Sequence, residues 1–470
     1  MKARGPMTPI AGAISVNGSF QPHLGSAPVG TRFTQPPQAR NRQPTMAGWF
    51  VDRMIVLLLL LAVIAVFTLS SAMLTNWKIH YVTAGGGFYE KFHPASGLSL
   101  LAFGLLLLRN GDPVGEIDRM FSRSKLILVY LGCWSLLLVQ MFVLTRPFTV
   151  IIDTFLLPVV LCLAIWQLSP AQRKPLVWAT HLSILLNVCL GYYEYFSGHR
   201  LIPLTLGDVL VIGEWRSSAL LGHPLTASGL VGGYILALVL RPALCPIAMF
   251  RIPLIAFCLG SLMAFGGRTA LVTVLLVLSF VVAKTAWLIV RGKRVSLPTV
   301  IATLCLLFVA AAGIFAAFDL GIFDKMLLRF SSDKGSALAR FATFDLLSHF
   351  DWQELVTGPN PTRVNALQAQ LGLNYGIENF WISCIVQFGL IHTVLLTIGL
   401  ICLFFEILKH ASPAAWAIVL LILVIAASSV SFSSKNIQLA QFIILITLLL
   451  PRETKAPAHR AVSTKPIRIY

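Results

Sequence analysis

The sequence predicts an all-α protein that crosses a membrane many times. Of its 470 residues, 57% are hydrophobic and only 11% are charged. A soluble protein cannot bury that much apolar surface. Long apolar runs such as the one beginning at Met54 have the roughly 20 residues that a helix needs to cross a bilayer. The alternating ten-residue segments typical of membrane β-strands are absent from the sequence, so we expect helical spans.

About twelve apolar segments have the composition of membrane spans, although the second and the seventh are short. They cover residues 54–74, 94–108, 126–144, 148–168, 176–192, 225–240, 252–265, 269–290, 297–317, 380–408, 415–433 and 437–450.

Both ends of the chain are basic and of low apolar content. Residues 1–48 are rich in Pro, Gly, Ser, Gln and Arg and contain no acidic residue, a composition typical of disorder. The predicted organisation is therefore a disordered basic tail over 1–48, a transmembrane domain over 49–450 and a second basic tail over 451–470.

The distribution of Lys and Arg predicts the orientation. With an even number of spans, the basic loops and both tails fall on one side, and the positive-inside rule places that side in the cytoplasm. This also explains the net charge of +18 without a nucleic-acid partner. The opposite side then receives the two long polar loops, about 193–224 and 318–378.

Four arginines are expected on that outer side. Arg216 follows Trp215, Arg268 stands where two spans meet, and Arg329 and Arg340 lie in the large loop. An interfacial anchor, a turn residue that reaches lipid phosphate, and solvated loop charges are the simpler interpretations. Arginines near the outer membrane surface also provide a charged fork that suits phosphate oxygens.

Three further polar residues precede apolar segments on the same side. Glu378 and Asn379 stand before the tenth segment, and His223 precedes Pro224. Helix capping explains Asn379, and Pro224 suits a helix start. The functional interpretation is a carboxylate and a histidine at the mouth of an outer cavity.

Other chemical signatures are missing from the sequence. It has no P-loop, no HExxH, no GxSxG and no dinucleotide fingerprint. The eight Cys lie mostly inside apolar runs without CxxC spacing, which supports neither disulfides nor zinc. We therefore expect neither a metal nor a cofactor.

Four short stretches, in this order, are similar to those of a known family. They are "RSSALLGHPLTASG" from Arg216, "GGRTALV" from Gly266, "SALAR" ending at Arg340, and "IENFWISCIVQFGL" from Ile377. In these stretches and in its late large outer loop, the chain resembles the O-antigen ligase and O-antigen polymerase-like family of bacterial surface-polysaccharide enzymes. The resemblance covers about residues 170–410.

The resemblance implies a GT-C-like fold in the bacterial inner membrane and metal-independent glycosyl transfer at its periplasmic face. The substrate is a glycan on undecaprenyl pyrophosphate, and a flippase and a chain-length regulator are the implied partners besides membrane lipids. Arg216, Arg268 and Arg340 would hold the pyrophosphate. Glu378 would orient or deprotonate the acceptor hydroxyl.

The sequence leaves three functions open. Family ligases usually carry His–Asn where this chain has Glu378–Asn379, which favours a polymerase of exopolysaccharide or O-antigen repeat units over a ligase acting on lipid A-core. A flippase or secondary transporter is the third possibility. Asp153, inside an apolar segment, is the most transporter-like residue, but the two halves of the chain show no convincing repeat.

Overall fold

The computed structural model describes residues 46–83, 85–203, 205, 206, 209, 210, 215–244, 250–292, 336–373, 376–429, 432 and 434–452. Helices dominate this part of the chain, which confirms the all-α prediction. The exception is an antiparallel hairpin of two-residue strands, β1 (Thr205–Leu206) and β2 (Val209–Leu210).

Within these described residues, six helical segments are long and apolar enough to cross a membrane. They are α1 (Met46–Thr68), α5 (Lys125–Val143), the continuous run of α6 (Thr149–Ile151), η2 (Ile152–Leu156) and α7 (Leu157–Gln167), α8 (Pro170–Ser197), α11 (Arg268–Val290) and α18 (Leu390–His410).

Shorter apolar helices coincide with further predicted segments. They are α3 (Pro94–Leu108), α9 (Pro224–Leu240), α10 (Arg251–Phe265), α19 (Ala415–Ser428) and α20 (Gln438–Ile444), which continues as η6 (Leu445–Leu449). The predicted segment 297–317 and both predicted tails, apart from a few residues at their inner ends, lie outside the described residues.

The remaining helices are short or polar. They are α2 (Ser71–Asn76), η1 (Phe88–Lys91), α4 (Pro113–Arg123), η3 (Ala219–Leu221), η4 (Pro242–Leu244), α14 (Ser336–Ser348), α15 (Trp352–Thr357), α16 (Pro361–Gln370) and α17 (Phe380–Phe388).

Several predicted boundaries differ from those of the structure, two of them at glycines with positive φ. The segment 380–408 is not one helix, because Gly389 has φ +83° and separates α17 from α18. The backbone of Gly389 lies against α15, where an added Cβ would come within 2.6 Å of the Val356 carbonyl oxygen, so only glycine fits this crossing. The loop predicted to begin at 193 begins later, because α8 continues to Ser197 and ends on the left-handed Gly198.

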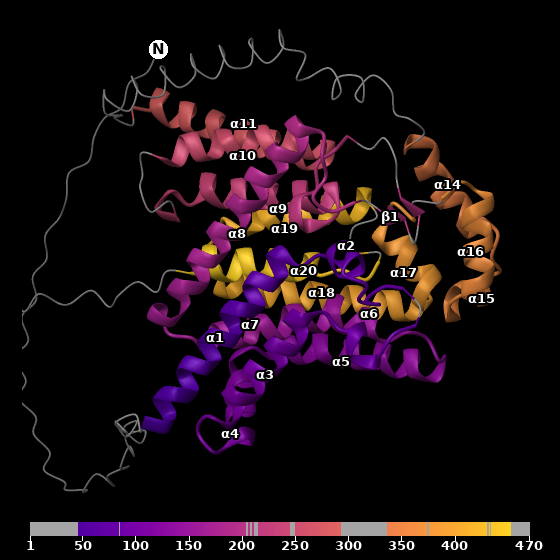
Figure 1. Ribbon diagram of the computed structural model, residues 1–470, viewed down its shortest axis with the longest axis horizontal. Coiled ribbons are helices and arrows are strands. Elements are labelled where there is room, and N and C mark those ends of the chain that lie inside the picture. Colours follow the sequence, from indigo (N-terminus) through magenta and orange to yellow (C-terminus); the bar gives the residue numbers. More distant parts are fainter. Residues whose placement is uncertain are drawn as a thin grey trace, which may run out of the picture. The chain divides into compact units, whose positions relative to one another are not determined.

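The apolar helices pack into one core (Figure 1). Helix α5 lies along α18, α1 lies against α3 and α8, and α9 contacts α10, α11, α19 and α20. The run that contains α7 packs on α3 and α20. Its π-helical turn η2 comes just before Pro158, which lacks the N–H that an uninterrupted α-helix would use.

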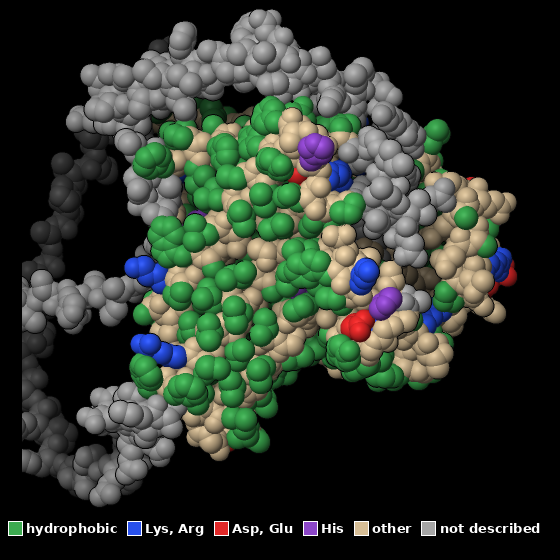
Figure 2. All heavy atoms as spheres, viewed as in Figure 1, with side chains coloured by type: hydrophobic (Ala, Val, Ile, Leu, Met, Phe, Trp, Pro, Cys, Tyr) green, Lys and Arg blue, Asp and Glu red, His purple; other side chains and the backbone are tan. Residues whose placement is uncertain are grey.

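The outward faces of these helices are hydrophobic. Leu276, Phe280 and Val282 on α11 are each more than 60% exposed. Figure 2 shows hydrophobic side chains over most of one face, with Lys and Arg side chains toward its left and right margins. A surface of this kind suits lipid rather than water.

The described part of the large predicted loop, 336–373, folds into helices with a small core of their own. Leu346, Phe350, Val364 and Leu373 are buried together with Ile382 of α17. Helices α14, α15 and α16 therefore pack on α17, beside the bundle (Figure 1).

Hydrogen bonds from side chains in and just after α5 to backbone carbonyls attach this helical unit to α5. Arg146 donates to the carbonyls of Gln387, Gly358 and Pro359. Gln140 donates to Phe388 O at 2.7 Å and, more weakly, to Thr357 O at 3.3 Å. The last carbonyls of α15 and α17, which lack partners inside their own helices, are thereby satisfied.

Candidate functional site

Two polar residues of α8 bind the backbone of the segment that carries Arg216. Both side chains are buried. The Glu194 carboxylate accepts hydrogen bonds from the N–H groups of Leu201, Ser218 and Ala219, at 2.8–2.9 Å. Asn187 Oδ1 accepts from Leu220 N at 3.1 Å. Bonds to a buried carboxylate are strong, so the backbone after Arg216 is fixed even though Ala219 has φ +49°.

The Gly266–Gly267 turn brings Arg216 and Arg268 to one place. Gly266 ends α10 with φ +62°, and an added Cβ would lie 2.7 Å from both Cγ and Cδ of Arg216. At Gly267 a Cβ would lie 2.0 Å from Ser228 Oγ. Both glycines therefore permit a close approach of neighbouring segments, and Arg268 follows as the first residue of α11.

Arg268 and Glu378 line a common cavity of about 60 Å³, which we call the arginine cavity. Both side chains are half-buried. The cavity has room for roughly two water molecules, so it would admit a few heavy atoms of a ligand without conformational change. Its other lining residues are Leu225, Ser228, Gly266, Gly267, Thr269, Ala270, Ile425, Ser428 and Ser429.

The other predicted residues near α17 have varied placements. Asn379 caps α17 through its Oδ1, which accepts from Ile382 N at 3.1 Å, so its capping role is confirmed. Arg340 belongs to α14, which packs on α17, but its side chain lies outside the described atoms. Arg329 lies outside the described residues.

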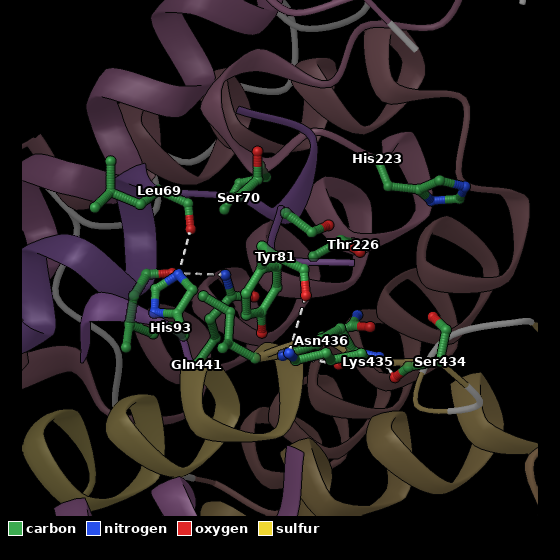
Figure 3. A pocket seen from close by; sticks show the side chains of 15 residues that line it. Leu69, Ser70, Tyr81, His93, His223, Thr226, Ser434, Lys435, Asn436 and Gln441 are labelled. Atoms are coloured by element: carbon green, nitrogen blue, oxygen red, sulfur yellow. Dashed lines mark hydrogen bonds between the residues drawn. The ribbon is translucent and has the colours of Figure 1, made fainter. Parts of the chain in front are cut away.

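His223 lies on the opposite side of the first turn of α9 from the arginine cavity. It caps α9, its Nδ1 accepts from Leu225 N at 3.2 Å, and Pro224 follows at the helix start as predicted. Its exposed ring lines a second cavity of about 150 Å³, which we call the glutamine cavity because Gln438 and Gln441 are among its lining residues. Figure 3 shows His223 and Gln441 with other residues that line it.

A buried ion pair lies beside the glutamine cavity. Lys435 Nζ is 3.7 Å from Asp153 Oδ2, and both side chains are nearly inaccessible to solvent. Lys435 also donates to the carbonyls of Tyr81 and Lys91 and lies 4.0 Å from the centre of the Tyr81 ring (Figure 3). Asp153 accepts from His93 N at 3.1 Å and from Ser96 Oγ at 2.5 Å.

Burial shifts the titration of the groups around this pair. Desolvation lowers the pKa of Lys435 to about 8, although the Asp153 charge opposes the shift. Burial likewise lowers the pKa of His93, and it raises the pKa of Tyr81 well above its ordinary value, with Asp153 as the second cause. Of these three groups, Lys435 is therefore the one whose pKa is brought from the basic range to just above neutral pH.

Sequence reasoning missed Asn187, Glu194 and Lys435. A signal existed for the first two, because they stand seven residues apart and so share one face of a single helix. Lys435 lies in a polar stretch between two apolar segments, and neither spacing nor motif distinguished it from a solvated loop charge.

The arrangement supports anion binding and proton transfer at one place. Arg268 provides a guanidinium fork, Arg216 lies next to the turn that carries it, and Glu378 faces the same cavity. Among the described residues, no group of three or more His, Cys, Asp or Glu side chains could hold a metal ion. Comparison with protein-family models, with curated proteins and with solved structures finds no match to this chain.

Proposed function

We propose that the protein polymerises oligosaccharide repeat units carried on undecaprenyl pyrophosphate, at the periplasmic face of the bacterial inner membrane. The proposal includes about twelve membrane-spanning helices, a GT-C-like architecture, and N- and C-termini in the cytoplasm. The observation that carries it is the shared cavity of Arg268 and Glu378, with Arg216 against the adjoining glycine turn. These residues come from separate parts of the sequence.

The reaction follows from the chemistry of these side chains. An acceptor sugar hydroxyl attacks the anomeric carbon of the donor from the face opposite the pyrophosphate. A new glycosidic C–O bond forms, the C–O bond to the pyrophosphate breaks, and the lipid pyrophosphate leaves with the electron pair. Glu378 takes the hydroxyl proton. The guanidinium groups of Arg216, Arg268 and Arg340 stabilise the charge on the leaving group.

Glu378→Gln tests the proposal, because the amide keeps the shape of the carboxylate but cannot take a proton. We expect at least a hundredfold loss of long polymer, the usual scale for a general base, with normal accumulation of the protein in membranes. The measurement is polymer length and amount on gels beside immunoblots of the protein. Glu354→Gln is the control, because Glu354 of α15 pairs with Arg363 of α16 and neither residue lines the arginine cavity. Normal polymer from the Glu378 variant would reject the assignment.

Secondary transport is the second candidate, and the Asp153–Lys435 pair is the observation that favours it. A buried carboxylate in a π-helical turn of an apolar helix, paired with a lysine from another segment, is a feature of ion-coupled transporters. The product that accumulates after deletion separates the functions. Single repeat units joined to their acceptor indicate a polymerase, long chains left on the carrier a ligase, and units trapped on the inner leaflet a flippase.

A further inference from the structure

The glutamine cavity contains a buried amide whose hydrogen-bonding groups are unused. Gln438 is 1% exposed, and neither its Nε2 nor its Oε1 has a hydrogen-bond partner in the described part of the chain. Gln441 donates from Nε2 to Val66 O at 2.9 Å, while its buried Oε1 also lacks a partner there. An unpaired buried polar atom costs about 1–3 kcal/mol, so these three atoms point to a ligand.

The charge around the cavity excludes an ionic ligand. Its cation, Lys435, is paired with Asp153 and bonded to the carbonyls of Tyr81 and Lys91. His93 is bonded through both ring nitrogens, to Leu69 O and Ala95 N. Apart from the His223 ring at its edge, the cavity offers a ligand mainly amide and hydroxyl groups, which carry no charge and both donate and accept.

The size and position of the cavity narrow the ligand further. Its volume of about 150 Å³ is that of a cavity that encloses benzene, so it has room for one ring at most, with the ring's substituents at the exposed mouth. It lies where α1 ends and where α3, α9 and α20 begin, since Leu69, His93, Thr226 and Gln438 all line it. Leu225 and Ser228 of the same α9 turn line the arginine cavity, so about one helix diameter, roughly 10 Å, separates the two.

We propose that the glutamine cavity is a subsite for one neutral pyranose ring of the glycan. Gln438 presents a donor and an acceptor side by side, which matches two neighbouring hydroxyls or an acetamido group. Gln441 Oε1 accepts from a further hydroxyl. Gly229 makes this geometry possible, because a Cβ there would lie 3.1 Å from Gln438 Nε2. The inference rests on the proposed function for the source of the sugar.

Binding of simple sugars to the purified full-length protein in detergent tests the subsite without turnover. The probes are N-acetylglucosamine, glucose and glucuronate at millimolar concentrations, followed by saturation-transfer NMR. We expect signals from the two neutral sugars and little from glucuronate. Gln438→Met should weaken neutral-sugar binding about tenfold or more, the loss for two hydrogen bonds of ordinary strength. Its melting temperature should be equal or higher, because the buried unpaired amide is replaced by an apolar group of similar size.

Two further variants keep the test decisive. Ser434→Trp places a ring at the exposed mouth of the cavity and should abolish binding even if the Gln438 variant misfolds. Glu378→Gln should bind sugar normally while losing polymerisation, so failure of the subsite and failure of the proposed function are separate results. No neutral-sugar binding by the wild type, preferred binding of glucuronate, or unchanged binding by both cavity variants overturns the inference.

Gln438→Met also identifies which of the two lipid-linked glycans, donor or acceptor, supplies the sugar ring. Each lipid-linked substrate is varied in turn at a fixed concentration of the other. A higher KM for the chain being extended assigns the subsite to the acceptor, and a higher KM for the incoming unit assigns it to the donor. An unchanged KM for both substrates overturns the role in the reaction.

Discussion

Two cavities lie on either side of the first turn of α9, and their charged residues differ in burial and in bonding. One is the arginine cavity and the other is the glutamine cavity. In the first, Arg268 and Glu378 are half-buried and line the cavity itself. At the second, Lys435 is one of the lining residues, but it and its partner Asp153 are nearly inaccessible to solvent and are bonded to backbone and side-chain groups of neighbouring segments. A charged group that lines a cavity can contact a ligand there, and a buried ion pair that is bonded to neighbouring segments also holds those segments together.

Removal of one member of the buried pair should give the largest effect on stability. In Asp153→Asn, Lys435 keeps its charge without the carboxylate that compensates it, and we expect a loss of about 3–5 kcal/mol. Combining Asp153→Asn with Lys435→Met should recover most of that loss. Thermal unfolding in detergent measures both. Equal melting temperatures for the single and double variants would show that the pair is not coupled, and the contrast between the two cavities would fail.

A methyl group at the glycine turn should perturb the arginine cavity more moderately. Gly267→Ala places a Cβ 2.0 Å from Ser228 Oγ, and we expect a cost of about 1–3 kcal/mol for the overpacking together with lower polymer yield. Ser228→Gly in the same chain should restore both by removing the obstructing side chain.

Gly97→Ala is the matched control for that substitution, because Gly97 lies in α3 with open space around the added methyl. It should leave polymer yield unchanged and stabilise the helix slightly. Polymer yield that stays normal in Gly267→Ala would show that the close approach of α9 and α11 does not set the position of Arg268.

The smallest expected effect is a pH dependence of stability that comes from the buried Asp153–Lys435 pair. The pKa of Lys435 is lowered to about 8 in the folded protein, whereas the unfolded chain holds that proton up to the ordinary lysine range. Between these values the unfolded state binds more protons, so the contribution of this group to stability rises with pH. Below about pH 8 both states are protonated and the contribution is constant.

Lys435→Met isolates this contribution from the other groups that titrate in the same range. The difference in melting temperature between wild type and variant should change between pH 8 and pH 10 and stay flat from pH 6 to pH 7.5. A difference that is constant across the whole range would contradict the lowered pKa.

Local chemistry explains which parts of the fold could be predicted. Pro224 suits the first position of a helix because it has no N–H that would need a partner, and Asn379 caps a helix because its side chain accepts from a backbone N–H of the first turn. Both effects depend only on neighbouring residues. The break at Gly389 could not be predicted, since an apolar run continues through it. What requires glycine there is the backbone of α15, which approaches from elsewhere in the chain.

The candidate site was predictable to the same extent. Arg216, Arg268 and Glu378 were selected by residue type and expected sidedness, and the structure places Arg268 and Glu378 at one cavity. Glu194 supports Arg216 through backbone N–H groups, a role that depends on tertiary contacts. Gln438 was not distinguishable either, because an unpaired amide is defined by what surrounds it and not by its neighbours in sequence.

The attachment of the α14–α16 unit at Arg146 constrains how this part of the molecule can vary. Arg146 and Gln140 bind carbonyl oxygens of residues 357–359, 387 and 388, which every amino acid possesses. Side chains at most of these positions are therefore free to change without loosening the attachment. Insertion or deletion of a single residue at the end of α15 or α17 would move these carbonyls out of reach of Arg146 and Gln140. Natural variation there is therefore expected in residue identity and not in length.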